Sequence, residues 1–226
     1  MNKPYITCYM MTSIDGRIDC AMTENLPGVE EYYQILSELN FDATISGRVT
    51  AETEIAEQGK FITKTNNKVN KEIISKKANA KKHYEIIIDT KGSLLWKNNK
   101  EYDEHMLIIM SEQVTQDYLQ YLDEKGISYI VTGSTKVNLA RAMEILKDDF
   151  NIQNVGVVGG SKINTAFLDL GLLDEVIVLI GAGIDGRKMF PTVFENDNPK
   201  RPLISLKLKE VKAFNTGSVL IKYKTK

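Results

Sequence analysis

The chain has 226 residues, of which 42% are hydrophobic and 26% charged, and its formal net charge is −1. This is the composition of an ordinary globular protein. A charge near zero argues against nucleic acid or an anionic membrane as the main partner, since both usually call for a basic surface. The two His and two Cys do not form the closely spaced pairs that a structural zinc site needs, and two Cys are too few for a disulfide scaffold, so we expect no bound metal.

The sequence also indicates the cellular location and the kind of partner to expect. Its first residues lack the long apolar region of a secretory signal, and two isolated Cys fit a reducing compartment, so we expect a cytoplasmic protein. No apolar run is long enough to span a membrane. The expected partner is a small-molecule substrate, and an enzyme so poor in His would rely on a bound cofactor for its chemistry.

Short apolar runs alternate with amphipathic stretches along the chain. Strands are predicted at residues 5–11, 43–46, 85–88, 106–110, 128–131, 155–158 and 175–180, and an antiparallel pair at 203–211 and 218–223. Helices are predicted at residues 28–40, 50–57, 114–122, 139–150 and 161–170, with Thr50 as the N-cap of the second. The Lys-rich stretch 60–82 is interpreted as a surface loop with some helix.

Strands that alternate with helices predict βαβ crossovers and a largely parallel sheet covered on both faces. We therefore expect a three-layer α/β/α fold, with a mostly parallel sheet extended by C-terminal antiparallel strands. Because no linker or shift in composition divides the chain, we expect one domain over residues 1–226.

Three polar turns follow predicted parallel strands, at the sheet edge where α/β proteins bind ligands. In MTSIDGR, the Ser13 hydroxyl and the Asp15 carboxylate come directly after the first strand, although the motif alone also fits a simple turn. In ISGRVT, Gly47 permits close backbone approach and Arg48 supplies a fork suited to phosphate, although a capped helix with a surface Arg fits equally well.

The third turn is VVGGSKIN, in which an apolar strand runs through Gly159-Gly160 into a helix. It is neither GxGxxG nor a Walker A loop. It nevertheless shares the physical basis of both motifs. Glycines allow the backbone to approach a pyrophosphate, and the start of the helix favours an anion.

The order MMTSIDGRI, ISGRVTAETE, IIIDT and VVGGSKINTAFLDLGLLDEVIVLI resembles one family over nearly the whole chain. It is the reductase domain at the C-terminus of the bifunctional riboflavin-biosynthesis deaminase–reductase, which has a dihydrofolate-reductase-like fold. The resemblance implies an NADPH-dependent, often dimeric reductase that delivers hydride to a pyrimidine- or pterin-like substrate, so we expect a homodimer.

Carried over position by position, the resemblance implies a role for each matching residue. Met11 would lie near the nicotinamide through its backbone. The adenosine side would be bordered by Gly47, Arg48, Thr50 and Glu54, with Thr90 also approaching the cofactor. The pyrophosphate would be held by Gly159, Gly160, Ser161, Lys162, Ile163 and Asn164. The charge of Arg48 favours the 2′-phosphate of NADPH, whereas the acidic Glu52 and Glu54 leave NADH as the alternative.

The chain departs from the family in its substrate half. The family commonly has Glu immediately before Gly-Gly, where this residue contacts the riboflavin precursor. In this chain Val158 occupies that position. We therefore expect poor reduction of the phosphorylated diaminopyrimidine precursor. Ser13 and Asp15 are the candidate catalytic groups, for orienting a substrate or relaying a proton. The alternatives are a nucleotide-binding or regulatory module that lacks riboflavin-pathway activity, and an assembly protein that acts through its dimer interface.

Overall fold

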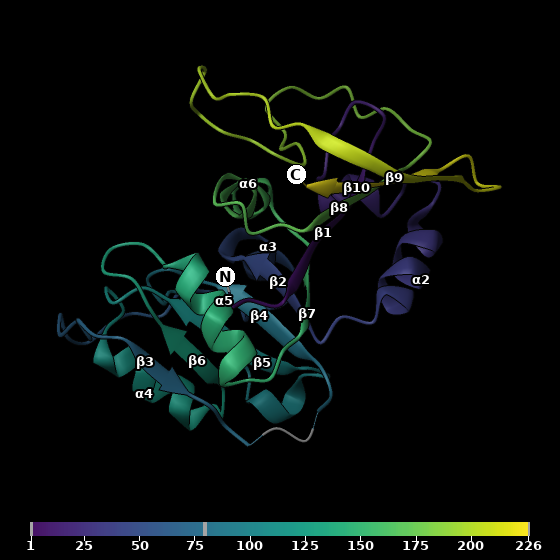
Figure 1. The fold of residues 1–226 in the computed structure, drawn as a ribbon. Helices are drawn as coiled ribbons and strands as arrows, with labels where there is room; N and C mark the ends of the chain where they lie inside the picture. Colours follow the sequence, from purple (N-terminus) through teal and green to yellow (C-terminus); the bar gives the residue numbers. More distant parts are fainter. Residues whose placement is uncertain (1, 79–80, 226) are drawn as a thin grey trace. The chain divides into compact units, whose positions relative to one another are not determined.

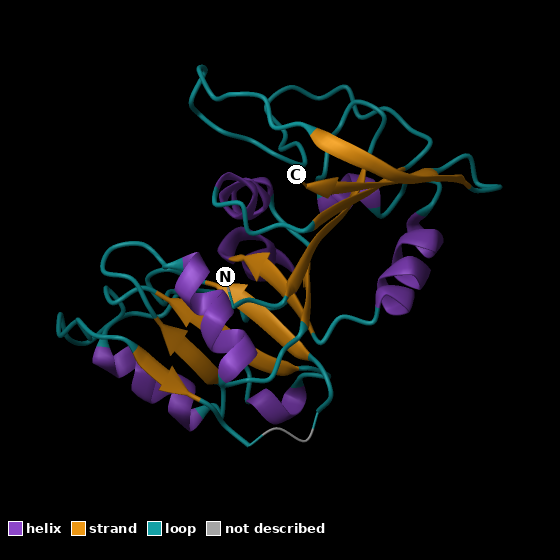
Figure 2. Ribbon diagram, in the orientation of Figure 1, coloured by secondary structure: helices purple, strands orange, loops and turns teal. Residues whose placement is uncertain are grey.

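The structure is a computed structural model that describes residues 2–78 and 81–225 (Figure 1). The chain divides into two compact units, each with its own strands and helices (Figure 2). The first unit is Met1–Pro4 and Asp42–Val155, and the second is Tyr5–Phe41 and Gly156–Lys226. Strand β7 (Asn154–Val157) contains the division between them. The expectation of one domain over residues 1–226 stays a prediction.

The first unit is built on four parallel strands and one antiparallel edge strand, in the order β3-β6-β5-β4-β2. The strands are β2 (Ala43–Gly47), β3 (Ile73–Ser75), β4 (Tyr84–Ile88), β5 (His105–Met110) and β6 (Ser128–Val131). Every residue of β5 is buried, as expected for a central strand that is covered on both faces.

Helices cover both faces of this sheet. They are α3 (Arg48–Glu54), α4 (Gln116–Glu124) and α5 (Leu139–Asp148), with the 3₁₀-helix η1 (Asn99–Glu101). Tyr118 of α4 packs with Ile87 and Ile108 in one core cluster. Tyr84 and Ile87 lie three positions apart on β4, so their side chains point to opposite faces of the sheet. The ring of Tyr84 contacts the ring of Phe150, just after α5.

The second unit combines a parallel strand pair with an antiparallel extension, in the order β1-β8-β10-β9. Its strands are β1 (Tyr5–Thr12), β8 (Glu175–Ile180), β9 (Leu206–Ala213) and β10 (Val219–Thr225), and its helices are α1 (Cys20–Thr23), α2 (Val29–Leu39) and α6 (Ser161–Asp169). Ile35 of α2 packs on Tyr9 and Leu179, which places that helix on one face of the sheet.

The predicted α/β class, with a mostly parallel sheet and C-terminal antiparallel strands, is confirmed. Two local predictions are wrong. The stretch 60–82 contains the short strand β3, and its described residues form no helix. Thr50 is not an N-cap, because α3 begins at Arg48 with Gly47 in the N-cap position. Helix α1 and the 3₁₀-helix η1 have no counterpart among the predicted elements.

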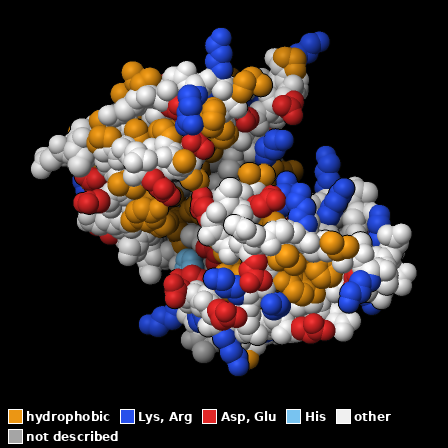
Figure 3. Space-filling view, turned by 180° about the vertical axis from the view of Figure 1, so that it is seen from behind, with side chains coloured by type: hydrophobic (Ala, Val, Ile, Leu, Met, Phe, Trp, Pro, Cys, Tyr) orange, Lys and Arg blue, Asp and Glu red, His pale blue; other side chains and the backbone are white. Residues whose placement is uncertain are grey.

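The surface carries both signs of charge. Figure 3 shows Lys and Arg side chains interspersed with Asp and Glu on the face drawn, without one continuous basic field. None of the helices in residues 2–78 and 81–225 has the length and apolar character needed to cross a bilayer.

Candidate functional site

The residues singled out from the sequence are divided between the two units. The first unit holds Gly47, Arg48, Thr50, Glu54 and Thr90. The second holds Met11, Ser13, Asp15, Val158, Gly159, Gly160, Ser161, Lys162, Ile163 and Asn164. The geometry is therefore described within each unit.

In the first unit, β2 passes into α3 through Gly47, whose extended backbone forms the N-cap. The preceding Ser46 is 2% exposed, and its Oγ has no hydrogen-bond partner among the described residues. A buried hydroxyl without a partner costs free energy unless a ligand or a water completes it. The carboxyl end of β2 therefore fits a polar ligand group.

Arg48 lies at the start of α3 and is engaged by its own helix. Its Nη1 lies 2.7 Å from Oε2 of Glu52, one turn further along, and both side chains are more than a third exposed. An exposed pair of this kind contributes little stability and is readily exchanged. Arg48 can thus exchange Glu52 for a second anion. Thr50 and Glu54 lie further along the same helix.

Thr90 follows β4, the neighbour of β2, in a loop closed by a buried carboxylate. Asp89 is 1% exposed and accepts the backbone N–H groups of Ser93 at 2.6 Å and Leu94 at 3.0 Å. The Thr90 carbonyl accepts both the N–H and the hydroxyl of Ser111, at the end of β5. The backbone of this loop is therefore fixed on two sides.

In the second unit, the chain turns tightly after β1 around the Ser13 hydroxyl. Ser13 is 1% exposed, and its Oγ donates to Oδ1 of Asp15 at 2.7 Å and accepts the N–H of Arg17 at 3.1 Å. Gly16 completes the turn with a φ of 82°. The Ser13 hydroxyl thus stabilises the turn in addition to being part of the candidate site.

Asp15 joins this turn to the loop that follows β8. Its carboxylate also accepts the backbone N–H groups of Asp185 at 3.0 Å and Gly186 at 2.9 Å. The hydroxyl of Ser13 and these two amides stabilise the charged form and hold the pKa of Asp15 well below its usual range. At neutral pH Asp15 is therefore ionised, which suits it to orienting a donor and not to releasing a proton.

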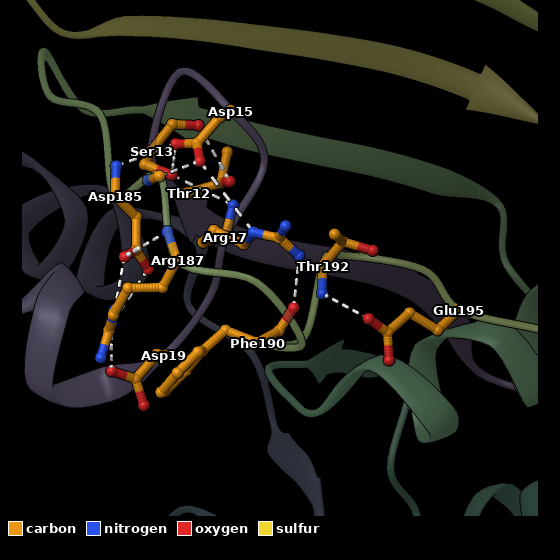
Figure 4. A network of polar contacts seen from close by, with 11 residues as sticks. Thr12, Ser13, Asp15, Arg17, Asp19, Asp185, Arg187, Phe190, Thr192 and Glu195 are labelled. Atoms are coloured by element: carbon orange, nitrogen blue, oxygen red, sulfur yellow. Dashed lines mark hydrogen bonds and ion pairs between the residues drawn. The ribbon is translucent and has the colours of Figure 1, made fainter.

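Arg187 and Arg17 extend the network seen in Figure 4. Arg187 pairs with Asp185 and with Asp19, and its guanidinium carbon lies 3.8 Å from the centre of the Phe190 ring. Arg17 donates from Nη1 to the Phe190 carbonyl, and its backbone pairs with Thr192. The loop after β8 is therefore tied to the turn after β1 at several points.

Gly159 and Gly160 lead from β7 into α6. Gly159 has a φ of 154°, in a region that favours glycine, so a side chain at this position would be strained. The preceding Val158 is half-buried and offers no polar atom. Met11, in β1, is 5% exposed and pairs with Leu179 through the backbone.

The first turn of α6 carries polar side chains that are buried. Ser161 is 7% exposed and donates from Oγ to Oε2 of Glu195 at 3.1 Å. Asn164 is fully buried; its Nδ2 donates to the Val193 carbonyl at 2.9 Å, and its Oδ1 has no partner among the described residues. The first N–H groups of any α-helix also lack intrahelical acceptors. The free N–H groups at this end of α6 therefore fit an anionic group, while Oδ1 of Asn164 fits a hydrogen-bond donor.

Several of these residues escaped the sequence reasoning. Ser46 and Arg17 lie inside the motifs ISGRVT and MTSIDGR, but no role is predicted for them, and Asp185 lies outside all three polar turns. Nothing in the local sequence singles out Glu195, because its partners Ser161 and Thr192 are set by the fold.

His105 lies outside these groups and is structural. It is 1% exposed between Asn99 and Ser128, and burial lowers its pKa to about 4. A pocket of about 350 Å³ also lies elsewhere in the second unit, among Leu168, Gly171, Leu173, Ile204, Ser205 and Thr225.

The model of the RibD C-terminal domain family matches residues 4–220. Solved structures with the same fold include a pyrimidine reductase-like protein from Corynebacterium diphtheriae, at 18% identity and a TM-score of 0.73 over 100% of this chain and 93% of that one. The riboflavin biosynthesis reductase of Saccharomyces cerevisiae aligns at 19% identity and a TM-score of 0.65, over 100% and 91%.

RibD from Acinetobacter baumannii aligns at 18% identity and a TM-score of 0.70. All of this chain is covered, but it spans only 59% of the length of that protein. At such low identities these structures establish the fold, while the family model reports membership.

Proposed function

Because the chain belongs to the RibD C-terminal domain family, we propose that it is an NADPH-dependent reductase. It would transfer hydride to a C=N or C=O carbon of a pyrimidine- or pterin-like substrate, as a 5-amino-6-(5-phosphoribosylamino)uracil reductase does. The family match over residues 4–220 is the observation that carries the proposal. The names of the similar structures, a pyrimidine reductase-like protein and a riboflavin biosynthesis reductase, point the same way.

The residues of each unit suit the cofactor. In the first unit, Ser46 offers a buried hydroxyl without a partner beside the cation of Arg48, which suits a 2′-phosphate. In the second unit, Gly159 and Gly160 permit close backbone approach by the pyrophosphate, and Oδ1 of Asn164, in the first turn of α6, is free to accept a donor group of the nucleotide. Bound NADPH would supply the hydride and its two electrons.

The protein's own contribution is mainly orientation. Asp15, held ionised, fixes the Ser13 hydroxyl on one side and the Asp185–Gly186 backbone on the other. The turn after β1 would thereby present a fixed polar edge to the substrate. Because the pKa of Asp15 is lowered, the proton that accompanies hydride transfer is not expected to come from this carboxyl group.

The substrate is expected to differ from the phosphorylated diaminopyrimidine precursor of riboflavin. Val158 stands where the family commonly has Glu, and an apolar side chain cannot accept a hydrogen bond from the substrate. If turnover has been lost altogether, the chain is a nucleotide-binding or regulatory module, which is the second candidate and also rests on Val158.

Nucleotide titration tests the proposal directly. Purified protein is titrated with NADPH and with NADH by calorimetry, and then screened for oxidation of the bound nucleotide with pyrimidine, pterin and carbonyl compounds. Tighter binding of NADPH and its oxidation by at least one class of compound are expected. Binding without oxidation across the screen favours the regulatory module, and binding of neither nucleotide excludes both.

We also propose a cytoplasmic homodimer. The edge strand β9 supports a partner surface in the second unit, because seven of its eight residues are exposed, including the apolar Leu208 and Val211, which are 54% and 57% exposed. Sedimentation of the purified chain tests this, and a monomer over the whole concentration range would contradict the dimer.

A further inference from the structure

Residues 183–201, here called the strap, connect two candidate regions of the second unit. At one end the strap is tied to the turn after β1, through Asp15 and Arg17. At the other it is tied to α6, because the Thr165 hydroxyl accepts the N–H of Glu195 at 2.8 Å and Asp169 binds Arg201. The strap therefore lies against the start of α6, where the proposed function needs a pyrophosphate.

Glu195 is the strap residue whose side chain reaches the first turn of α6. Oε2 of its carboxylate accepts the Ser161 hydroxyl at 3.1 Å, and Oε1 accepts the backbone N–H of Thr192 at 2.9 Å. Ser161 is the first residue of α6, so a negative charge stands at the positive end of the helix. The charge is favourable there, and it lies where a bound phosphate would find the same partners.

Within the described part of the chain, Glu195 leaves one buried polar atom in the first turn of α6 without a hydrogen-bond partner. Asn164, one turn into α6, is fully buried, and its Oδ1 has no hydrogen-bond partner among the described residues. Its amide is fixed on the other side, where Nδ2 donates to the Val193 carbonyl of the strap. A buried carbonyl oxygen without a donor indicates that a hydrogen-bond donor, such as a ligand hydroxyl or amide group, belongs to this region beside the phosphate.

We propose that Glu195 is an internal anion that competes with the dinucleotide for the first turn of α6, and so sets the affinity for the cofactor. This inference rests on the proposed function. A phosphate that approaches Ser161 meets the carboxylate at hydrogen-bond distance from the same hydroxyl, and the two like charges repel. The nucleotide binds when Glu195 gives up Ser161 and turns toward solvent, which its exposed position permits.

Removal of the charge at constant shape separates this role from a purely structural one. Glu195→Gln keeps an acceptor for the Thr192 N–H and lacks the negative charge. It is expected to bind NADPH about three- to tenfold more tightly than the native protein at low ionic strength, and to lose this gain in high salt. The pyrophosphate is common to both nucleotides, so the gain in affinity for NADH should be equal.

Three further variants complete the experiment. Glu195→Ala should show the same gain as Glu195→Gln, and Glu195→Asp, which keeps the charge, should bind like the native protein. Asp197→Asn is the matched control, because it removes an equal charge from an exposed residue of the same strap. Its affinity should be unchanged. Thermal unfolding of each variant verifies that it is folded.

The outcomes divide cleanly. If the native protein binds NADPH and Glu195→Gln binds it equally or more weakly, the inference is overturned while the proposed function stands. An equal gain in Asp197→Asn also overturns it, because the effect would then be one of total charge. If the native protein binds neither nucleotide and Glu195→Gln does, the proposed function of the native protein is overturned, while the competition of Glu195 with the nucleotide is supported. Absence of binding in every protein overturns both proposals.

Discussion

The carboxylate of Asp15 accepts the backbone N–H of Asp185 at 3.0 Å, so residues 170 positions apart in the chain hold two loops of the second unit together. The same carboxylate accepts the N–H of Gly186 and the hydroxyl of Ser13. A charged acceptor makes these bonds stronger than a neutral one would. Asp15 is thus the point at which the turn after β1 and the strap are joined.

Asp15→Asn should weaken this junction and lower the thermal midpoint. Since the folded-state pKa of Asp15 lies below its ordinary value of 3.8, the stability that it contributes is present above that value and is lost as the pH falls through the folded pKa. Acid unfolding followed by circular dichroism should therefore show a smaller loss of stability in the variant than in the native protein. A parallel pH dependence of the two proteins would contradict this, and Asp197→Asn is the control.

Arg48→Ala tests the 2′-phosphate contact. Loss of the guanidinium should weaken NADPH about tenfold and leave NADH nearly unchanged, because one charge-assisted contact is removed from NADPH alone. Arg141→Ala is a matched control in the same unit, since Arg141 is also 41% exposed and also pairs with a Glu of its own helix. An equal loss for both nucleotides in Arg48→Ala would show that Arg48 does not bind the 2′-phosphate.

Val158→Glu restores the carboxylate that the family commonly carries before its Gly-Gly. We expect it to raise kcat/KM for the phosphorylated diaminopyrimidine by about tenfold or more, since one well-placed hydrogen bond to a charged group is worth roughly 1.5–3 kcal/mol. Val158→Gln is the neutral control of similar size. If neither variant gains activity while both still bind NADPH, the substrate half differs at more than this position.

Glu85 predicts a pH dependence of opposite sign. It lies on β4, where Thr44 donates to its carboxylate at 2.6 Å, and burial raises its pKa from 4.5 to about 7. Its contribution to stability is therefore fully present below pH 4.5 and lost as the pH rises through 7. Glu85→Gln should remove that loss. Relative to the native protein, the free energy of unfolding of the variant should rise by about 1–3 kcal/mol as the pH increases from 4.5 to 7.

Urea unfolding at several pH values measures this gain. A constant difference between Glu85→Gln and the native protein across the range would show that the carboxyl group does not titrate on unfolding. Thr44 lies next to Glu85, and Thr44→Val removes the hydroxyl that donates to its carboxylate. This substitution should raise the pKa of Glu85 further.

Much of the fold was predictable because its strands are apolar runs with clear ends. The predicted bounds of β6 and β8 agree with the structure, and α2 ends at Leu39, before the C-cap Asn40, which has a positive φ. Strand β3 was missed because its two isoleucines lie in a Lys-rich stretch, and its pairing with β6 is not local. The N-cap of α3 was misplaced because Gly47 takes that position without a side chain.

The candidate site was predictable only where a motif is contiguous. Ser13 and Asp15 stand two positions apart, and their hydrogen bond follows from the turn. Glu195 and Ser161 are 34 positions apart and Asp15 and Gly186 are 171 apart, so only the folded chain reveals these contacts. The orphaned oxygens of Ser46 and Asn164 likewise depend on burial, which a short motif does not encode.

Hydride transfer is tested most directly with NADPH in which both hydrogens at nicotinamide C4 are replaced by deuterium. The native protein is mixed with this nucleotide and with the best substrate from the screen, and the product is examined by mass spectrometry and NMR. Transfer of one deuterium, as deuteride, from the nucleotide to a single carbon of the product, at equal amounts of nucleotide oxidised and product formed, is the predicted result. Binding of NADPH without its oxidation by any compound, or a product without deuterium, would contradict a hydride-transferring reductase.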